Sequence, residues 1–260
     1  MRLDVATVLV QWAAGGLLGG WLTTRRRTVS SGYGWLFRSV YLVLGTGGAI
    51  VGIVGGAGSG VGALVRDGGA LGMSMFAAAA LWVSVVRRRI PVGDRGGFSP
   101  VLDLLAPAAG LVAVLGAASA VGGSYPLSTA RLVVGAVFLG LVTDAMLLGH
   151  WYLVQPGLPR DPIKELVGLV RWVLPVEVLV LLLPTGMGSV ITGKIDDGYG
   201  GLLSWIWIVS ALTTLGLIVL ARRALEERYY SAVMSATGLL YLAILTALGT
   251  DVLARALLAR

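Results

Sequence analysis

The sequence predicts an all-α membrane protein, a polytopic bundle of about eight transmembrane helices. Hydrophobic residues make up 57% of the 260 residues and charged residues only 13%, whereas a soluble domain carries about a quarter charged residues. Apolar stretches of about 20 residues, long enough to cross a bilayer, recur along the chain. Because backbone polar groups in lipid must pair within their own segment, we expect these stretches to be helices.

The first predicted span covers 4–24. The N-terminal region is neutral, since Arg2 is offset by Asp4, and three arginines (25–27) follow the span. This pattern is typical of a span whose N-terminus lies outside, and not of a cleaved signal peptide. The other predicted spans are 35–57, 69–86, 101–123, 131–154, 166–186, 202–221 and 229–250.

The distribution of basic residues predicts the orientation. Of the 20 Lys and Arg residues, twelve fall after the first, third, fifth and seventh spans: Arg25, Arg26, Arg27, Arg87, Arg88, Arg89, Arg95, Arg160, Lys164, Arg222, Arg223 and Arg228. The positive-inside rule then puts these loops in the cytoplasm and both termini outside, in the plasma (inner) membrane. The C-terminal "DVLARALLAR" is expected to continue the last helix along the outer surface.

Short sequence matches indicate an internal repeat. "LLGGW" (17–21) ends the first span and "LLGHW" (147–151) ends the fifth, and three further matches fall in the same order at offsets of 128 to 134. One of them aligns Arg38 with Arg171. We predict two tandem four-helix repeats, residues 1–125 and 126–260, related by a pseudo-two-fold axis along the membrane normal.

The ionisable residues of the fifth and sixth spans are the candidate site. Asp144 and Glu177 are predicted roughly 15 and 18 Å deep, and His150 and Arg171 roughly 6 and 9 Å deep, at 1.5 Å per residue. Charged groups within the membrane are costly and commonly functional. Two neighbouring carboxyls in a low-dielectric site tend to share one proton, which is how a proton- or cation-handling site is built. The alternative is a structural ion pair in which Arg171 neutralises one acid.

His150 is the only histidine, and the chain has no cysteine. With Trp151 and Tyr152 it could form part of an aromatic belt in contact with lipid, or contact a quinone. A single histidine argues against a bis-histidine haem and a multi-histidine zinc site. The cofactor is left unknown, with quinone as an open candidate. Asp196 and Asp197, in an outer loop, are expected to form a solvated turn.

The favoured function is translocation of a proton, ion or small solute through Asp144, Glu177, Arg171 and His150. The alternative is an accessory subunit of a larger, possibly redox, membrane complex, in contact with quinone or lipid. The expected partners are the bilayer and either a second copy or a larger complex. No basic stretch is long enough for nucleic-acid binding, and no catalytic residue set is evident, so an enzyme is the less favoured class.

Overall fold

The computed structural model describes residues 4–56, 60–88, 99–183 and 186–258, and every regular element among them is a helix. The prediction of an all-α membrane bundle is confirmed. The described residues form eight long helices and one short helix, α7, which lies between α6 and α8. Their bounds are α1 (Val5–Thr24), α2 (Ser31–Val54), α3 (Val61–Arg88), α4 (Pro100–Ala120), α5 (Tyr125–Val154), α6 (Asp161–Leu182), α7 (Met187–Ile191), α8 (Leu202–Glu226) and α9 (Tyr230–Leu258).

Seven of these helices are long and apolar enough to cross a membrane, so the protein is an integral, multi-pass membrane protein. The helix that differs from the eight-span prediction is α6. Its 22 residues are enough for a span, but its last 18 include Glu165, Arg171 and Glu177. α6 is therefore the least suited of the long helices to be surrounded by lipid.

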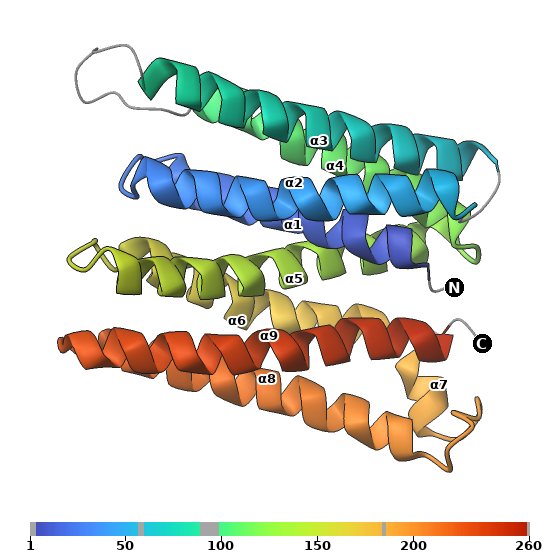
Figure 1. The fold of residues 1–260 in the computed structure, drawn as a ribbon. Coiled ribbons are helices and arrows are strands. Elements are labelled where there is room, and N and C mark those ends of the chain that lie inside the picture. The colour runs from blue at the N-terminus through green and yellow to red at the C-terminus, as the bar shows by residue number, and fades with distance from the viewer. Residues whose placement is uncertain (1–3, 57–59, 89–98, 184–185, 259–260) are drawn as a thin grey trace.

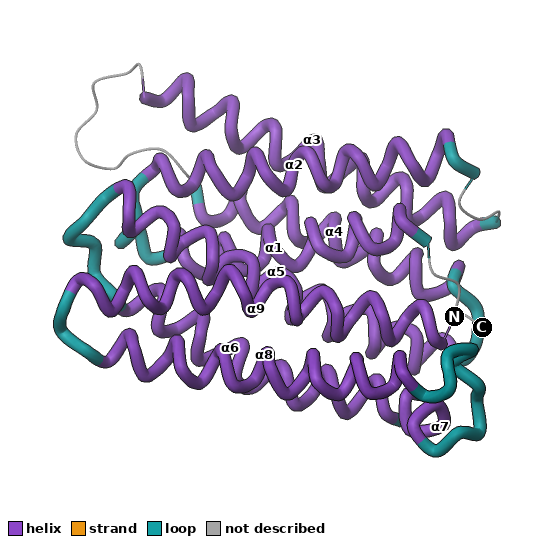
Figure 2. Tube along the Cα trace, turned by 60° about the horizontal axis from the view of Figure 1, so that its bottom comes forward, coloured by secondary structure: helices purple, strands orange, loops and turns teal. Residues whose placement is uncertain are grey.

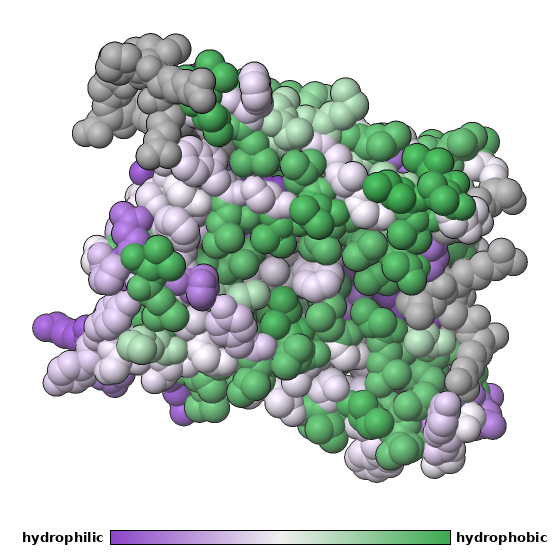
Figure 3. All heavy atoms as spheres, in the orientation of Figure 1, coloured by the Kyte–Doolittle hydropathy of each residue, from purple (hydrophilic) through white to green (hydrophobic). Residues whose placement is uncertain are grey.

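The long helices run side by side, and the chain reverses between two ends of the bundle (Figure 1). The turns α1–α2, α5–α6 and α8–α9 lie at one end, which we call the basic end after its arginines. The start of α1, the end of α9, and α7 lie at the opposite end, which we call the terminal end. Hydrophobic residues cover the middle of the face in Figure 3, and hydrophilic residues gather chiefly toward the two ends.

Helices in the two halves of the chain pack in the same order. In the first half, α1 packs against α2 and α4, and α3 also packs against α2 and α4. In the second half, α5 packs against α6 and α9, and α8 also packs against α6 and α9. This order is the one that duplication of a four-helix unit would produce. The duplication itself, with halves 1–125 and 126–260, stays a prediction.

The two halves meet where α1 crosses α5, in the middle of the bundle (Figures 1 and 2). A Cβ atom on Gly15 would lie 1.7 Å from the carbonyl oxygen of Ala136, and one on Gly140 would lie 2.0 Å from the carbonyl carbon of Gly15. Small residues spaced four apart let helix backbones approach this closely in membranes. On α5 this stripe of small residues continues directly to Asp144.

Three helices extend further toward the terminal end than predicted. α3 begins at Val61 instead of residue 69, α5 begins at Tyr125 instead of 131, and α9 runs to Leu258 instead of 250. The added segments of α3 and α9 carry charged residues, which in the sequence suggest the end of a span. Arg66, Asp251 and Arg255 in these segments are buried, and so is Arg131, the first residue of the fifth predicted span. The C-terminal segment accordingly continues α9 into the bundle, and the prediction that it follows the outer surface was wrong.

Candidate functional site

Five polar side chains from four helices are buried together near the terminal end, and we call them the terminal cluster. They are Gln11 from α1, Arg131 from α5, Glu177 from α6, and Asp251 and Arg255 from α9. Each is at most 7% exposed. Each lies roughly 5–10 Å inside the terminal end of its own helix, at 1.5 Å per residue. The cluster holds two acids and two arginines, so its formal charges balance.

A glycine makes room for this cluster. A Cβ atom on Gly135 of α5 would lie 2.4 Å from Nε2 of Gln11, 2.6 Å from Oδ1 of Asp251 and 2.8 Å from Nη2 of Arg255. Three side chains from two other helices therefore converge on the bare backbone of α5. Any larger residue at this position would occupy the space in which they meet.

Both arginines of the cluster are held by hydrogen bonds. Arg255 donates from Nη2 and Nε to Oδ1 of Asp251, at 2.8 and 3.0 Å, one turn earlier in α9. Arg131 donates to the carbonyl oxygens of Val180 (3.0 Å) and Leu183 (2.6 Å). The last carbonyls of a helix lack partners within it, so Arg131 caps α6 from α5 and fixes the end of the helix that carries Glu177.

Glu177 is fully buried, and neither of its carboxyl oxygens accepts a hydrogen bond from a described residue. Its side chain lies within hydrogen-bonding reach of Asp251, and the charges of Arg255 and Arg131 also act on it. Two carboxylates can only accept, so a hydrogen bond between them requires a proton on one of them. The cluster therefore contains an acid pair with the geometry for sharing a proton.

Other polar atoms of the cluster also lack partners. Among the described residues, both amide atoms of Gln11 and Oδ2 of Asp251 are buried without a hydrogen bond. Buried polar groups are nearly always paired. A site with several unpaired donors and acceptors, two acids and two fixed cations is suited to bind and release a proton or another small polar species.

Asp144 lies in a separate polar contact, and the predicted pairing of Asp144 with Glu177 was wrong. Tyr41 of α2 donates to Oδ1 of Asp144 at 2.9 Å, and Oδ2 faces Gly19 of α1. The error came from the assumed helix ends. Because α6 begins at Asp161 and not near Glu165, Glu177 lies roughly 24 Å from the basic end of its helix, against roughly 15 Å for Asp144.

Arg171 and His150 do not join either acid. Both side chains are exposed on the outside of the bundle. Nδ1 of His150 lies 3.1 Å from the hydroxyl of Tyr241 on α9, and the two rings meet edge to face. The predicted layer of His150 and Arg171 beneath the acids is therefore not formed, and Arg171 does not neutralise Glu177. The positive charges that act on Glu177 are those of Arg255 and Arg131.

Trp151 and Tyr152 were predicted to contact lipid or quinone, but they hold loops at the basic end. Tyr152 is 2% exposed and donates its hydroxyl hydrogen to the carbonyl oxygen of Pro159. Trp151 donates from Nε1 to Oγ of Ser30 at 2.9 Å. Its ring packs over Gly32. Through this contact α5 of the second half is tied to the start of α2 in the first half.

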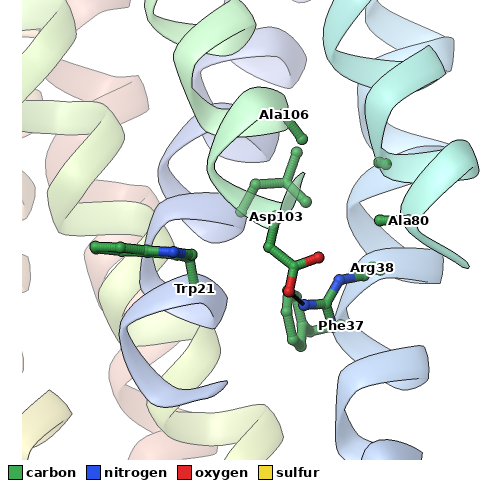
Figure 4. Close-up of a pocket in the computed structure, with 8 residues that line it drawn as sticks. Trp21, Phe37, Arg38, Ala80, Asp103 and Ala106 are labelled. Carbon is green, nitrogen blue, oxygen red and sulfur yellow. Dashed lines mark hydrogen bonds and ion pairs between the residues drawn. The ribbon is translucent and has the colours of Figure 1, made fainter. Parts of the chain in front are cut away.

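A buried ion pair in the first half was missed from the sequence. Nη2 of Arg38 donates to Oδ2 of Asp103 at 2.7 Å, and the guanidinium lies over the ring of Phe37 (Figure 4). The pair borders a small recess that also contains Trp21, with space for about one water molecule. An acid in the first turn of the fourth predicted span was the available signal, but we used Arg38 only to align the repeats.

In the described part of the chain, no group of three or more His, Cys, Asp or Glu residues is arranged to hold a metal ion. Comparison with known proteins gives no matching family model, no similar curated protein and no similar solved structure. The terminal cluster is therefore interpreted from its own chemistry.

Proposed function

We propose that the protein translocates protons, or a small solute coupled to protons, across the membrane through the terminal cluster. The observation that carries this proposal is the contact between Glu177 and Asp251, two fully buried acids within hydrogen-bonding reach. This contact can alternate between a state with a shared proton and a state without it. We take the basic end to be cytoplasmic, in accordance with the positive-inside rule.

The surroundings of the pair support a transport role over a purely structural one. In a structural ion pair the acid has a direct cationic partner, as Asp103 has in Arg38 at 2.7 Å. In the terminal cluster, Arg255 already binds Asp251 and Arg131 already binds the α6 carbonyls. No described residue donates a hydrogen bond to Glu177. Burying its negative charge is costly, and binding a proton neutralises that charge.

The test is proton flux into liposomes that contain the purified protein. A potassium gradient with valinomycin sets the membrane potential, and an entrapped dye reports internal pH. We expect flux above that of protein-free liposomes, and a loss of at least tenfold in Glu177→Gln. Glu177→Asp should keep a measurable part of the flux because it retains the acid. Asp196→Asn, in an exposed loop, is the matched control and should leave the flux unchanged.

Two results would count against the proposal. One is a wild-type flux equal to that of empty liposomes over the whole range of imposed potential and pH. The other is a Glu177→Gln variant that folds, as judged by its thermal transition and elution volume, and transports as fast as the wild type. The alternative predicted from the sequence, an accessory subunit of a larger complex in contact with quinone or lipid, does not require Glu177 to exchange a proton.

A further inference from the structure

The outer face of α6 combines exposed apolar side chains with a charge. Residues 171, 172, 175, 176 and 179 follow the spacing of one helical stripe, and all five are exposed. Trp172 is 75%, Val176 45% and Leu179 53% exposed. The opposite side of α6 packs against α5 and α8. This stripe, which we call the α6 face, is therefore the side of the helix that the bundle leaves open.

Arg171 is the charged residue of this face and lies at the end of it nearer the basic end. It is halfway along α6, roughly 15 Å from either end of the helix at 1.5 Å per residue. Its guanidinium has no hydrogen bond or ion pair with another described residue. An arginine at such a depth is costly when it faces lipid, and in membrane proteins such residues almost always face protein or water.

The backbone carbonyl of Arg171 also loses its usual hydrogen-bond donor within the helix. Pro175 lies within α6, and because proline has no N–H it cannot donate to the carbonyl oxygen of Arg171, four residues earlier. A long guanidinium side chain can bend along the helix toward the headgroups. A backbone carbonyl cannot. A carbonyl freed by proline in a membrane helix is normally satisfied by a neighbouring helix or an ordered water.

We propose that the α6 face binds a transmembrane helix of a different membrane protein, which places an acidic side chain against Arg171. A carboxylate pairs with a guanidinium through two parallel hydrogen bonds. A hydroxyl or amide donor beside that acid would serve the carbonyl of Arg171. Trp172, Val176 and Leu179 supply the apolar contact around the pair.

A second copy of this chain does not fit the same face. In a two-fold dimer through α6, a surface meets its own copy, and Arg171 would face Arg171. Four acids within the described helices, Asp103, Asp144, Glu177 and Asp251, are buried in their own bundle. Two others, Asp67 and Glu165, are already paired with arginines of the same chain. Charge complementarity therefore points to a partner with a sequence of its own.

The test uses a photo-crosslinking amino acid in place of Trp172, with the full-length protein expressed in its native membrane. We expect a crosslinked peptide from a transmembrane helix of another protein, with Asp or Glu within about one turn of the modified residue. Arg171→Gln should lower the yield of this crosslinked product at least fivefold. Arg171→Glu combined with replacement of the partner's acid by arginine should restore it. The matched control places the crosslinker at Trp205, which is 66% exposed on α8 and should capture lipid.

Adducts with lipid alone, or with a second copy alone, would overturn the proposal. So would a partner peptide without an acid, or a yield that does not depend on Arg171. None of these outcomes bears on Glu177, so this proposal and the proposed transport function can fail separately.

Discussion

Gly140 of α5 faces Gly15 of α1 with no side chain between them: a Cβ atom at residue 140 would lie 2.0 Å from the carbonyl carbon of Gly15. The two halves of the protein are thus in contact through backbone atoms. Since backbone atoms cannot move aside as a flexible side chain can, this contact tolerates no added methyl group.

Gly140→Ala should therefore destabilise the protein strongly, by about 3 kcal/mol or more, because overpacking against backbone forces the helices apart. Gly216→Ala and Gly238→Ala are the matched controls, since a Cβ atom at either position meets nothing within 4 Å. Each should be neutral or stabilise by up to about 1 kcal/mol through helix propensity. Reversible unfolding in mixed detergent micelles measures all three, and equal effects at 140 and 216 would contradict the close contact.

Tyr41→Phe should destabilise the protein by about 1–3 kcal/mol, because it removes the donor to Oδ1 of Asp144 and leaves a buried acceptor unmet. The effect should shrink when Asp144 is already replaced by alanine. A double-mutant cycle on Tyr41 and Asp144 gives this coupling, expected at about 0.5–3 kcal/mol. A coupling near zero would mean that the 2.9 Å contact contributes nothing to stability.

Buried and exposed ion pairs should respond differently to loss of the acid. Asp251→Asn removes the charge that pairs with Arg255, which is 4% exposed, and should cost about 3 kcal/mol. Glu165→Gln breaks the contacts with Arg25 and Arg26 at the basic end, where the Glu165 side chain is 30% exposed, and should cost less than about 1 kcal/mol. High salt should further reduce only the second effect. Chemical unfolding at low and high ionic strength distinguishes the two.

The loop before α8 should loosen in acid. Oδ1 of Asp197 accepts hydrogen bonds from the N–H groups of Gly201 and Tyr199, at 2.9 Å each, and these bonds lower the pKa of its carboxyl. A lowered pKa means that the stabilisation is fully present above the unfolded value of about 3.9 and is lost as pH falls through the folded value. The Leu203 amide also donates to Asp197, to its Oδ2. The hydrogen-exchange protection factors of the Gly201 and Leu203 amides, which correct for slower intrinsic exchange in acid, should therefore fall below about pH 4.

Asp197→Asn is the control for this pH dependence. It should exchange faster at neutral pH and show no further acid transition from this group. If the wild type and the variant had the same pH profile, the hydrogen bonds to Asp197 would not be what orders the loop.

The fold class could be predicted because composition and apolar length alone require helices in lipid. The helix ends could not be predicted, because a charged residue in the sequence suggests the end of a span even where the helix continues. Arg66, for example, lies where the sequence suggests a loop. In the structure it is 1% exposed and is paired with Asp4 and Asp67.

Only part of the candidate site could be predicted, because the assumed ends of the helices were wrong. Glu177 was identified as a buried acid, since it interrupts an apolar stretch. Its partner Asp251 was assigned to a surface tail, and its neighbour Gln11, uncharged and within the first span, gave no signal. Contacts between α1, α6 and α9 depend on how the helices pack, and the order of residues along the chain does not contain that information.

The α1–α5 crossing also has a consequence for passage through the membrane. Where backbone touches backbone there is no space for water, so the seam between the two halves is sealed at its middle. The terminal cluster lies on one side of that seal, and Asp144 lies on the other. Under the proposed transport function, a proton that leaves Glu177 and Asp251 would therefore travel within the second half, among α5, α6, α8 and α9. Asp144 would then connect the two halves through Tyr41 and would not be part of the route.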